Sequence, residues 1–159
     1  MSRDITEEEV KRFAAAWFVA LDVHAPNDEC VRFLADEGLE MIFPEQTLQG
    51  VSDFLAWYSG GTYSDGTSAP GVVNIFFDEN HVLQSAQPKI SGEKAEVRVV
   101  VEWQASWIEP PAPKSKRTSL EATQEWSLRR SDKNTYGLEI VRYVAIDEPF
   151  KYAPGFAQL

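Results

Sequence analysis

The sequence has few of the residues that build metal, disulfide or redox sites. It holds one cysteine, Cys30, and two histidines, so no internal disulfide can form and no Cys/His cluster has zinc-ligand spacing. No window approaches the roughly 18 apolar residues of a membrane-spanning helix. The charged N-terminal stretch "MSRDITEEEV" also lacks the apolar centre of a signal peptide. These absences predict a cytoplasmic protein that needs no metal or organic cofactor.

Positive charge is also scarce. Lysine and arginine number 15 against 25 aspartates and glutamates, which gives a formal net charge of −10. A surface this acidic repels phosphate backbones and anionic lipid headgroups, so we expect neither nucleic acid nor membrane as a partner. The basic stretch "PKSKR" at 113–117 is short and follows prolines, and we interpret it as a solvated loop.

Apolar residues, in contrast, are plentiful enough to bury a core. They make up 43% of the chain, and aromatic residues alone make up 12%. The length of 159 residues predicts one domain over 1–159, with a core from 6 to 147 and an irregular tail from 148 to 159.

The N-terminal third of the sequence shows helical periodicity. Thr6 followed by Glu9 fits a capping box, and apolar residues recur at helical spacing from there to residue 22. Pro26 can open a second helix, with Gly38 as its C-terminal stop. A short strand over 39–43 and a third helix over 50–59 complete this part of the pattern, which the break at 60–71 separates from the rest. That break is either a lid or a long connection.

Beyond residue 80 the period changes from 3.6 to 2, which is typical of strands. The expected strands cover 81–90, 94–108, 118–130 and 137–147, and turn residues join them as hairpins. The fold class is therefore α+β. We expect three N-terminal helices packed in the concave face of a strongly curved, mostly antiparallel sheet, an α+β cone.

Three stretches make this expectation more specific. "FAAAWFVALD", "LADEGLEMIFPEQTLQG" and "FLAWY" occur in the order seen in the nuclear-transport-factor-2-like superfamily (cystatin-like fold), and the sequence resembles its SnoaL-like members in particular. The resemblance covers residues 6–147. It implies a pocket for a small apolar molecule between the sheet and the first helix, and a homodimer formed through the sheet face. It does not choose a reaction, because members of the superfamily include both enzymes and binding or association domains.

The mechanism of one enzyme class in this superfamily does not fit this chain. Ketosteroid isomerases use a carboxylate base immediately before a proline at the end of the first strand. The matching residue here is Phe43, before Pro44, and a phenyl ring cannot accept a proton. If the chain is an enzyme, its base must stand elsewhere.

Aromatic residues are the best candidates for the wall of the cone, since five tryptophans in one small domain give broad and stiff apolar surfaces. Each of them can equally be an ordinary core residue. Gln124 stands among apolar neighbours, where its amide either orients a ligand oxygen or bonds nearby backbone. The predicted ligand-binding residues are Phe13, Trp17, Phe43, Phe54, Tyr58, Trp103, Gln124 and Trp126.

His81 is the predicted acid–base residue. It begins the first long strand, and Asp78 or Glu79 just before it can raise its basicity, so His81 and Asp78 are the predicted catalytic pair. The alternative is a strand-end histidine in a polar turn. The other histidine, His24, follows Asp22 at the end of the first helix. We expect these two residues to finish the helix and turn the chain, with Asp22 bonding backbone amides, although a ligand contact at the rim is the alternative.

Three functions remain open from the sequence. The first is a small-molecule-binding protein of unassigned reaction, with an apolar or aromatic metabolite in the cone. The second is a cofactor-independent isomerase, cyclase or dehydratase that uses His81, and the third is a non-catalytic dimeric association domain. An ionisable group that faces an open volume of several hundred Å³ favours the enzyme, whereas a wholly aromatic and aliphatic wall favours the binding protein.

Overall fold

A computed structural model describes residues 3–109, 114–145, 151–157 and 159. The helical segments are α1 (Glu7–Asp22), α2 (Asn27–Cys30), the 3-10 turn η1 (Val31–Phe33), α3 (Gly50–Ser59) and α4 (Val72–Ile75). The strands are β1 (Glu40–Ile42), β2 (Thr47–Gln49), β3 (Gly61–Thr62), β4 (Ser68–Ala69), β5 (Phe77–Ser91), β6 (Lys94–Ile108), β7 (Ser115–Arg130), β8 (Leu138–Ala145) and β9 (Lys151–Tyr152). The end of the predicted core at 147 lies outside the described residues.

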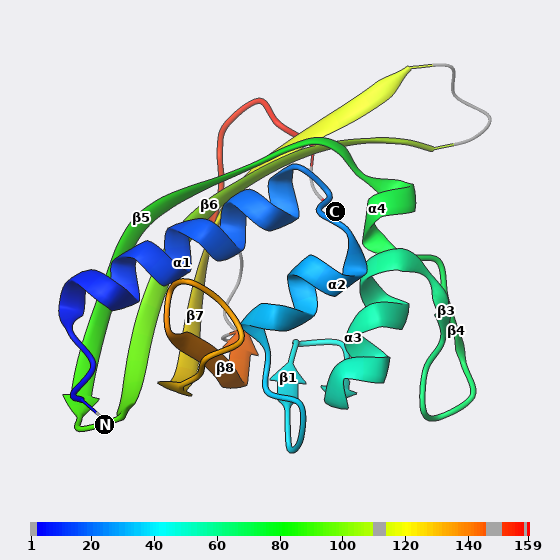
Figure 1. Cartoon of the computed structure of the whole chain (residues 1–159). Coiled ribbons are helices and arrows are strands. Elements are labelled where there is room, and N and C mark those ends of the chain that lie inside the picture. Colours follow the sequence, from blue (N-terminus) through cyan, green and yellow to red (C-terminus); the bar gives the residue numbers. More distant parts are fainter. Residues whose placement is uncertain (1–2, 110–113, 146–150, 158) are drawn as a thin grey trace.

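The main sheet has the strand order β2-β1-β8-β7-β6-β5, and β9 pairs with β7. All of these pairs are antiparallel except β1 with β8. The long strands β5 and β6 arch over α1, and α2, α3 and α4 lie at the other end of the curved sheet (Figure 1). The predicted α+β cone, with the helices in the concave face, is confirmed.

The first helix forms because its sequence provides a cap and one apolar face. The Thr6 hydroxyl accepts a hydrogen bond from the Glu9 amide at 3.2 Å, and the Glu9 carboxylate accepts one from the Thr6 amide at 3.0 Å, so the predicted capping box is present. The inward face is buried against the sheet: Val10, Phe13, Ala14, Trp17, Phe18 and Leu21. The strands bury alternate residues in the same core, as β6 does with Ala95, Val97, Val99 and Val101.

The second predicted helix is shorter than its sequence suggests. Helical backbone ends with η1 at Phe33, because Leu34 turns to extended dihedrals and forms a bridge with Ile140 of β8. Cys30, Phe33 and Leu34 are all buried. The expected stop at Gly38 is therefore wrong, since sheet contacts end the helix earlier.

The predicted break at 60–71 folds into a small hairpin, β3 and β4, beside α3 (Figure 1). Asp53 of α3 holds it: this buried carboxylate accepts hydrogen bonds from the Ser64 amide at 2.7 Å and the Ser64 hydroxyl at 2.9 Å. These bonds, with one from the Gln49 amide, keep the pKa of Asp53 below its usual value although burial acts to raise it. The hairpin is tied to the body of the molecule.

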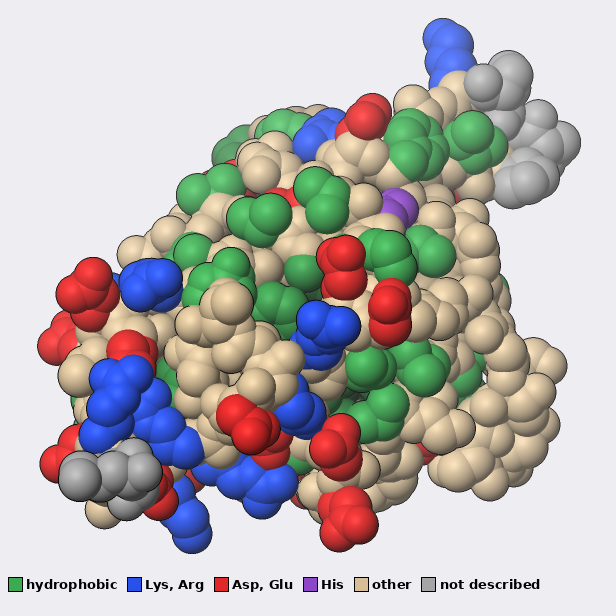
Figure 2. Space-filling view, in the orientation of Figure 1, with side chains coloured by type: hydrophobic (Ala, Val, Ile, Leu, Met, Phe, Trp, Pro, Cys, Tyr) green, Lys and Arg blue, Asp and Glu red, His purple; other side chains and the backbone are tan. Residues whose placement is uncertain are grey.

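Some apolar side chains remain at the surface. Val19 and Val23, at the outer side and end of α1, are 58% and 68% exposed. On this face of the molecule, charged side chains interrupt the hydrophobic ones (Figure 2). In the described part of the chain, no helix is both long and apolar enough to cross a membrane.

Candidate active site

A pocket of ≈ 290 Å³ opens between the C-terminal end of α1, the helices α3 and α4, and the concave face of the sheet. Its size lies just below the range of about 300–1,000 Å³ that is usual for ligand pockets. Most of the lining is apolar or aromatic, with a few polar groups among it. The lining residues are Leu21, Phe43, Glu45, Trp57, Tyr58, Val72, Phe76, Glu79, His81, Val101, Trp103, Leu120, Ala122, Gln124, Tyr143, Ala145 and Leu159.

Strand register explains why three long strands contribute to one wall. His81 of β5 stands opposite Trp103 of β6, which stands opposite Leu120 of β7. Cross-strand partners share a face of the sheet, and residues two apart on a strand return to that face. Glu79, which lies at a register irregularity of β5, lines the same pocket.

His81 is held in this wall by Asp22, the last residue of α1. The two residues lie 59 positions apart in sequence, yet His81 Nδ1 is 2.5 Å from Asp22 Oδ1. The second carboxylate oxygen, Oδ2, accepts a hydrogen bond from the backbone amide of His81 at 3.0 Å. The ring stacks on Phe18 with centroids 4.9 Å apart. Two bonds to one carboxylate and a stacked ring fix the orientation of the imidazole.

This arrangement assigns the ring nitrogens of His81. An ionised carboxylate only accepts hydrogen bonds, so Nδ1 carries the proton that points at Asp22. The other nitrogen, Nε2, has no hydrogen-bond partner among the described residues. The side chain of His81 is 11% exposed and lines the pocket. The pocket therefore holds an oriented imidazole with a free basic nitrogen, backed by a carboxylate that can stabilise the imidazolium.

The position of Asp22 is unfavourable for the helix alone. The C-terminal end of a helix carries partial negative charge, which disfavours a carboxylate, and the last turn of α1 contains no basic residue. The amide and ring of His81 supply the compensating interactions. Asp22 thus violates the charge preference of a helix end at the point where α1 meets β5 at a pocket. Such violations are typical of functional sites.

A second histidine–carboxylate pair lies beside the first. Glu79 Oε2 contacts His24 Nε2, and Glu79 Oε1 accepts a hydrogen bond from the indole of Trp103 at 3.1 Å. The side chain of Glu79 is 4% exposed, whereas that of His24 is 27% exposed. Both carboxylate oxygens of this buried group are therefore satisfied.

The far side of the pocket carries amide and phenol groups. Gln124 Oε1 accepts a hydrogen bond from the Trp126 indole at 3.1 Å. Burial raises the pKa of the Tyr143 phenol, against a hydrogen bond from Gln124 that lowers it. Burial also raises the pKa of Tyr58, whose hydroxyl donates to the Ala25 carbonyl oxygen at 2.6 Å. These phenols stay protonated and act as neutral hydrogen-bonding groups.

The structure divides the predicted ligand-binding residues into two groups. Phe43, Tyr58, Trp103 and Gln124 line the pocket. The other four do not line it: Phe13, Trp17, Phe54 and Trp126 are at most 1% exposed and pack on one another and on Phe33 in the core. Periodicity shows that these side chains point inward but cannot show whether they meet packing or open volume.

The residues near the two histidines also pair differently from the expectation. Asp78 was the expected partner of His81, but it does not line the pocket, and its backbone carbonyl accepts a hydrogen bond from Arg117 at 3.0 Å. Asp22 contacts His81 instead of turn amides, and His24 contacts Glu79. Sequence reasoning missed the long-range partner, and the one signal for it was a carboxylate at a helix C-terminus.

Charge in the pocket has one sign. Glu45 and Glu79 line it, and no lysine or arginine is among the lining residues that the structure describes. Likewise, no group of three or more histidine, cysteine or acidic side chains in the described part of the chain is arranged to hold a metal ion. Apart from the two phenols, which stay protonated, the ionisable side chains that line the pocket are an imidazole and carboxylates.

Comparison with solved structures identifies the fold of the chain. A protein from Novosphingobium aromaticivorans provisionally named a scytalone dehydratase superposes with a TM-score of 0.67 over 95% of this chain and 94% of its own, at 12% identity. A nuclear-transport-factor-2-like protein from Salmonella enterica superposes with a TM-score of 0.61 over 93% of this chain and 92% of its own, at 12% identity. The chain has the nuclear-transport-factor-2-like cone fold. The same cone fold occurs in a hexachlorocyclohexane dehydrochlorinase from Novosphingobium barchaimii, with a TM-score of 0.66, 12% identity and coverage of 96% and 92%.

The resemblance of the sequence to this superfamily is thus confirmed at the level of the fold. No family model matches the sequence, and no curated protein is significantly similar to it. With identities this low, the cone fold does not by itself assign a reaction, which must be argued from the side chains.

Proposed function

We propose that this protein is a cofactor-independent acid–base enzyme that catalyses an elimination on a small, neutral, largely apolar molecule. The observation that carries the proposal is His81: its Nδ1 is bound to Asp22, and its Nε2 is unpaired in a pocket of ≈ 290 Å³. A purely aromatic and aliphatic wall would have favoured a binding protein, and this wall holds an oriented base.

The chemistry follows from the free nitrogen. His81 Nε2 takes a proton from a carbon next to an electron-withdrawing group, the C–H electron pair forms the new double bond, and the leaving group departs with its bonding electrons. Asp22 acts as a positioning residue, because its carboxylate holds the imidazole and stabilises the imidazolium. The proton on Nε2 then passes to water or to the leaving group, which restores the base.

Two solved structures with the same fold support elimination over other proton transfers. One is provisionally named a scytalone dehydratase and the other a hexachlorocyclohexane dehydrochlorinase, names that describe loss of water and of hydrogen chloride. The lining supports a neutral substrate, since it offers no lysine or arginine that would pair with an anion.

The test uses a neutral aromatic β-hydroxy ketone, the aldol of benzaldehyde and acetone, whose dehydration to benzylideneacetone is followed by absorbance. The wild-type protein should accelerate this reaction, and His81→Gln should lower the rate by about 10²–10⁴-fold, the usual contribution of a general base. Glu7→Gln, a change on an exposed side chain of α1, is the matched control and should keep the wild-type rate. Equal rates for the wild type and His81→Gln would refute the proposal.

Association through the sheet face is a separate proposal, which rests on the superfamily resemblance. We expect a homodimer in light scattering at micromolar concentration. A monomer would contradict that expectation without affecting the proposed reaction, because every residue of the His81–Asp22 pair comes from one chain.

A further inference from the structure

The pocket holds two histidine–carboxylate pairs, and the proposed reaction uses only one. The second joins Glu79 of β5 to His24, which follows α1. Glu79 and His81 stand two residues apart on one strand, so both side chains point to the concave face and line the pocket. A substrate in contact with His81 is therefore also near Glu79.

Glu79 is held more firmly than a pocket wall requires. Its two oxygens are bound by different elements, Oε1 by the indole of Trp103 on β6 and Oε2 by His24. From the outer face of the sheet, Arg117 donates to the carbonyl oxygen of Asp78, directly before Glu79, at 3.0 Å. A carboxylate that is 4% exposed needs such partners to remain in the wall.

The backbone around this pair is also unusual. In the described part of the chain, the non-glycine residues with positive φ are His24 at 52° and Asp78 at 51°. One is a member of the pair and the other precedes its partner, at a register irregularity of β5. Positive-φ conformations of non-glycine residues gather at functional sites, and β-bulges re-aim side chains next to active sites. The two positive-φ residues and the irregularity of β5 thus all lie next to the His24–Glu79 contact.

The two members of the pair differ in their exposure to solvent. Glu79 lines the pocket and is 4% exposed, whereas His24 is 27% exposed. The pair therefore connects the interior of the pocket with bulk water through two groups that each hold and release a proton.

We propose that Glu79 is the general acid of the elimination and that His24 supplies its proton from solvent. This inference rests on the proposed function. As the carbon–oxygen bond of a hydroxylated substrate breaks, the departing oxygen takes a proton from the Glu79 carboxyl and leaves as water. Glu79 recovers a proton from His24 Nε2, and His24 takes one from bulk water. His81 meanwhile holds the proton removed from carbon and releases it to water, so the protons balance over one turnover.

Hydroxide and chloride leaving groups separate this role from a purely structural one. Hydroxide needs a proton to leave, whereas chloride does not. The experiment measures two probes that give the same product, benzylideneacetone: the benzaldehyde–acetone aldol and its β-chloro counterpart, each above its uncatalysed rate. The variants are Glu79→Gln, which keeps the size and an acceptor for Trp103, and His24→Asn, chosen because asparagine tolerates positive φ.

The expected result is a loss of selectivity between the probes. Glu79→Gln should lower the ratio of hydroxy to chloro elimination by about 10²-fold or more, the usual size of general acid catalysis. His24→Asn should lower the same ratio, and added imidazole should restore hydroxy elimination in this variant, because free imidazole can replace a partly exposed proton donor. The control Glu7→Gln should keep the wild-type ratio.

Each outcome has one reading. If Glu79→Gln slows both probes equally, or if imidazole leaves His24→Asn unrescued, the pair only fixes the end of α1 to β5 and the inference is wrong. If His81→Gln is inactive on both probes while Glu79→Gln keeps the wild-type ratio, the proposed function stands and only this inference falls. If the wild type eliminates neither probe, both fall together.

Discussion

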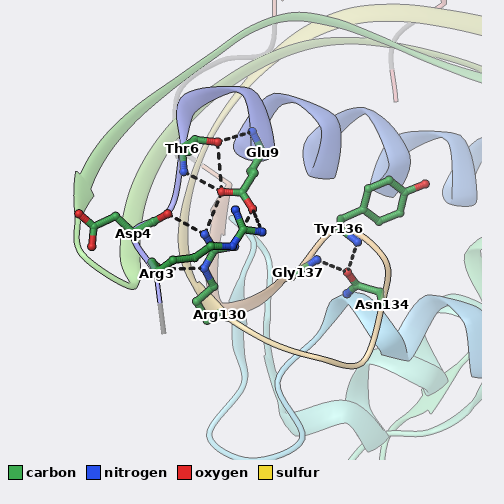
Figure 3. A network of polar contacts seen from close by, with 8 residues as sticks. All are labelled: Arg3, Asp4, Thr6, Glu9, Arg130, Asn134, Tyr136 and Gly137. Atoms are coloured by element: carbon green, nitrogen blue, oxygen red, sulfur yellow. Dashed lines mark hydrogen bonds and ion pairs between the residues drawn. The ribbon is translucent and has the colours of Figure 1, made fainter. Parts of the chain in front are cut away.

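The ion pair between Glu9 and Arg130 lets one stability prediction be worked out in full. Arg130, at the end of β7, binds both carboxylate oxygens of Glu9 at 2.7 and 2.9 Å and also donates to the backbone carbonyls of Arg3 and Asp4 (Figure 3). The Glu9 carboxylate in turn completes the capping box with Thr6. One side chain thus joins the start of α1 to the sheet.

The carboxyl titration gives the size of the effect. Hydrogen bonds from Arg130, above all, lower the pKa of Glu9 from 4.5 to about 2, although burial acts in the opposite direction. Such a shift corresponds to about 3 kcal/mol of folding free energy. Because the folded pKa is below the unfolded one, this contribution is present above pH 4.5 and is lost as the pH falls towards 2.

The assay is denaturant unfolding followed by tryptophan fluorescence, with the wild type and Glu9→Gln compared over the acid range. Near neutral pH the variant should be less stable by about 2–3 kcal/mol, and the difference should shrink as the pH falls from 4.5 to 2. The control Glu7→Gln, on the same helix turn but 66% exposed, should change stability by no more than about 0.5 kcal/mol. A stability difference for Glu9→Gln that stays constant down to pH 2 would refute the electrostatic account.

Three further predictions test the core, a tight turn and the charge of the pocket. Phe13→Ala should lower the free energy of unfolding by about 3–5 kcal/mol, because this ring is fully buried between Phe33 and Trp126, and denaturant titration measures it. Gly71→Ala should cost about 3 kcal/mol or more in thermal unfolding, since a Cβ there would lie 2.5 Å from the Gly60 nitrogen at a φ of +89°. The control Gly38→Ala, with nothing within 4 Å, should cost only about 1–2 kcal/mol. Cinnamate should bind at least about tenfold more weakly than the isosteric neutral benzylideneacetone in fluorescence quenching, because burying its charge is costly where no lining lysine or arginine pairs with it; equal affinities would contradict the neutral-substrate proposal.

The order of elements could be read from the sequence because their signals are local. Thr6 and Glu9 mark the start of α1 within one turn, and the alternation of polar and apolar residues from 94 to 99 marks a strand buried on one face. The length of the second helix could not be read, because the residue that ends it, Leu34, leaves the helix to bridge Ile140, more than a hundred positions away. Long-range pairing decided that boundary.

The candidate site shows the same difference between local signals, which can be read from the sequence, and long-range contacts, which cannot. His81 stood out in the sequence as an imidazole at the predicted start of the first long strand, although β5 begins earlier, at Phe77. Its carboxylate is Asp22, 59 positions earlier, and no spacing rule connects a helix C-terminus with a strand that folds back onto it. From the sequence alone, Asp78 was the expected partner of His81, and Asp22 was grouped with His24. In the folded chain, His81 contacts Asp22 and His24 contacts Glu79. Trp17 packs against Phe33 in the core instead of lining the pocket.

The central claim is that His81 and Asp22 act as one unit in the pocket, and a double-mutant cycle tests it most directly. Hydroxy ketone elimination is measured for the wild type, His81→Gln, Asp22→Asn and the double variant. If Asp22 works through the imidazole, each single change lowers the rate and the double variant is no slower than His81→Gln. Full multiplication of the two single effects, or a wild-type rate in Asp22→Asn, would contradict the claim.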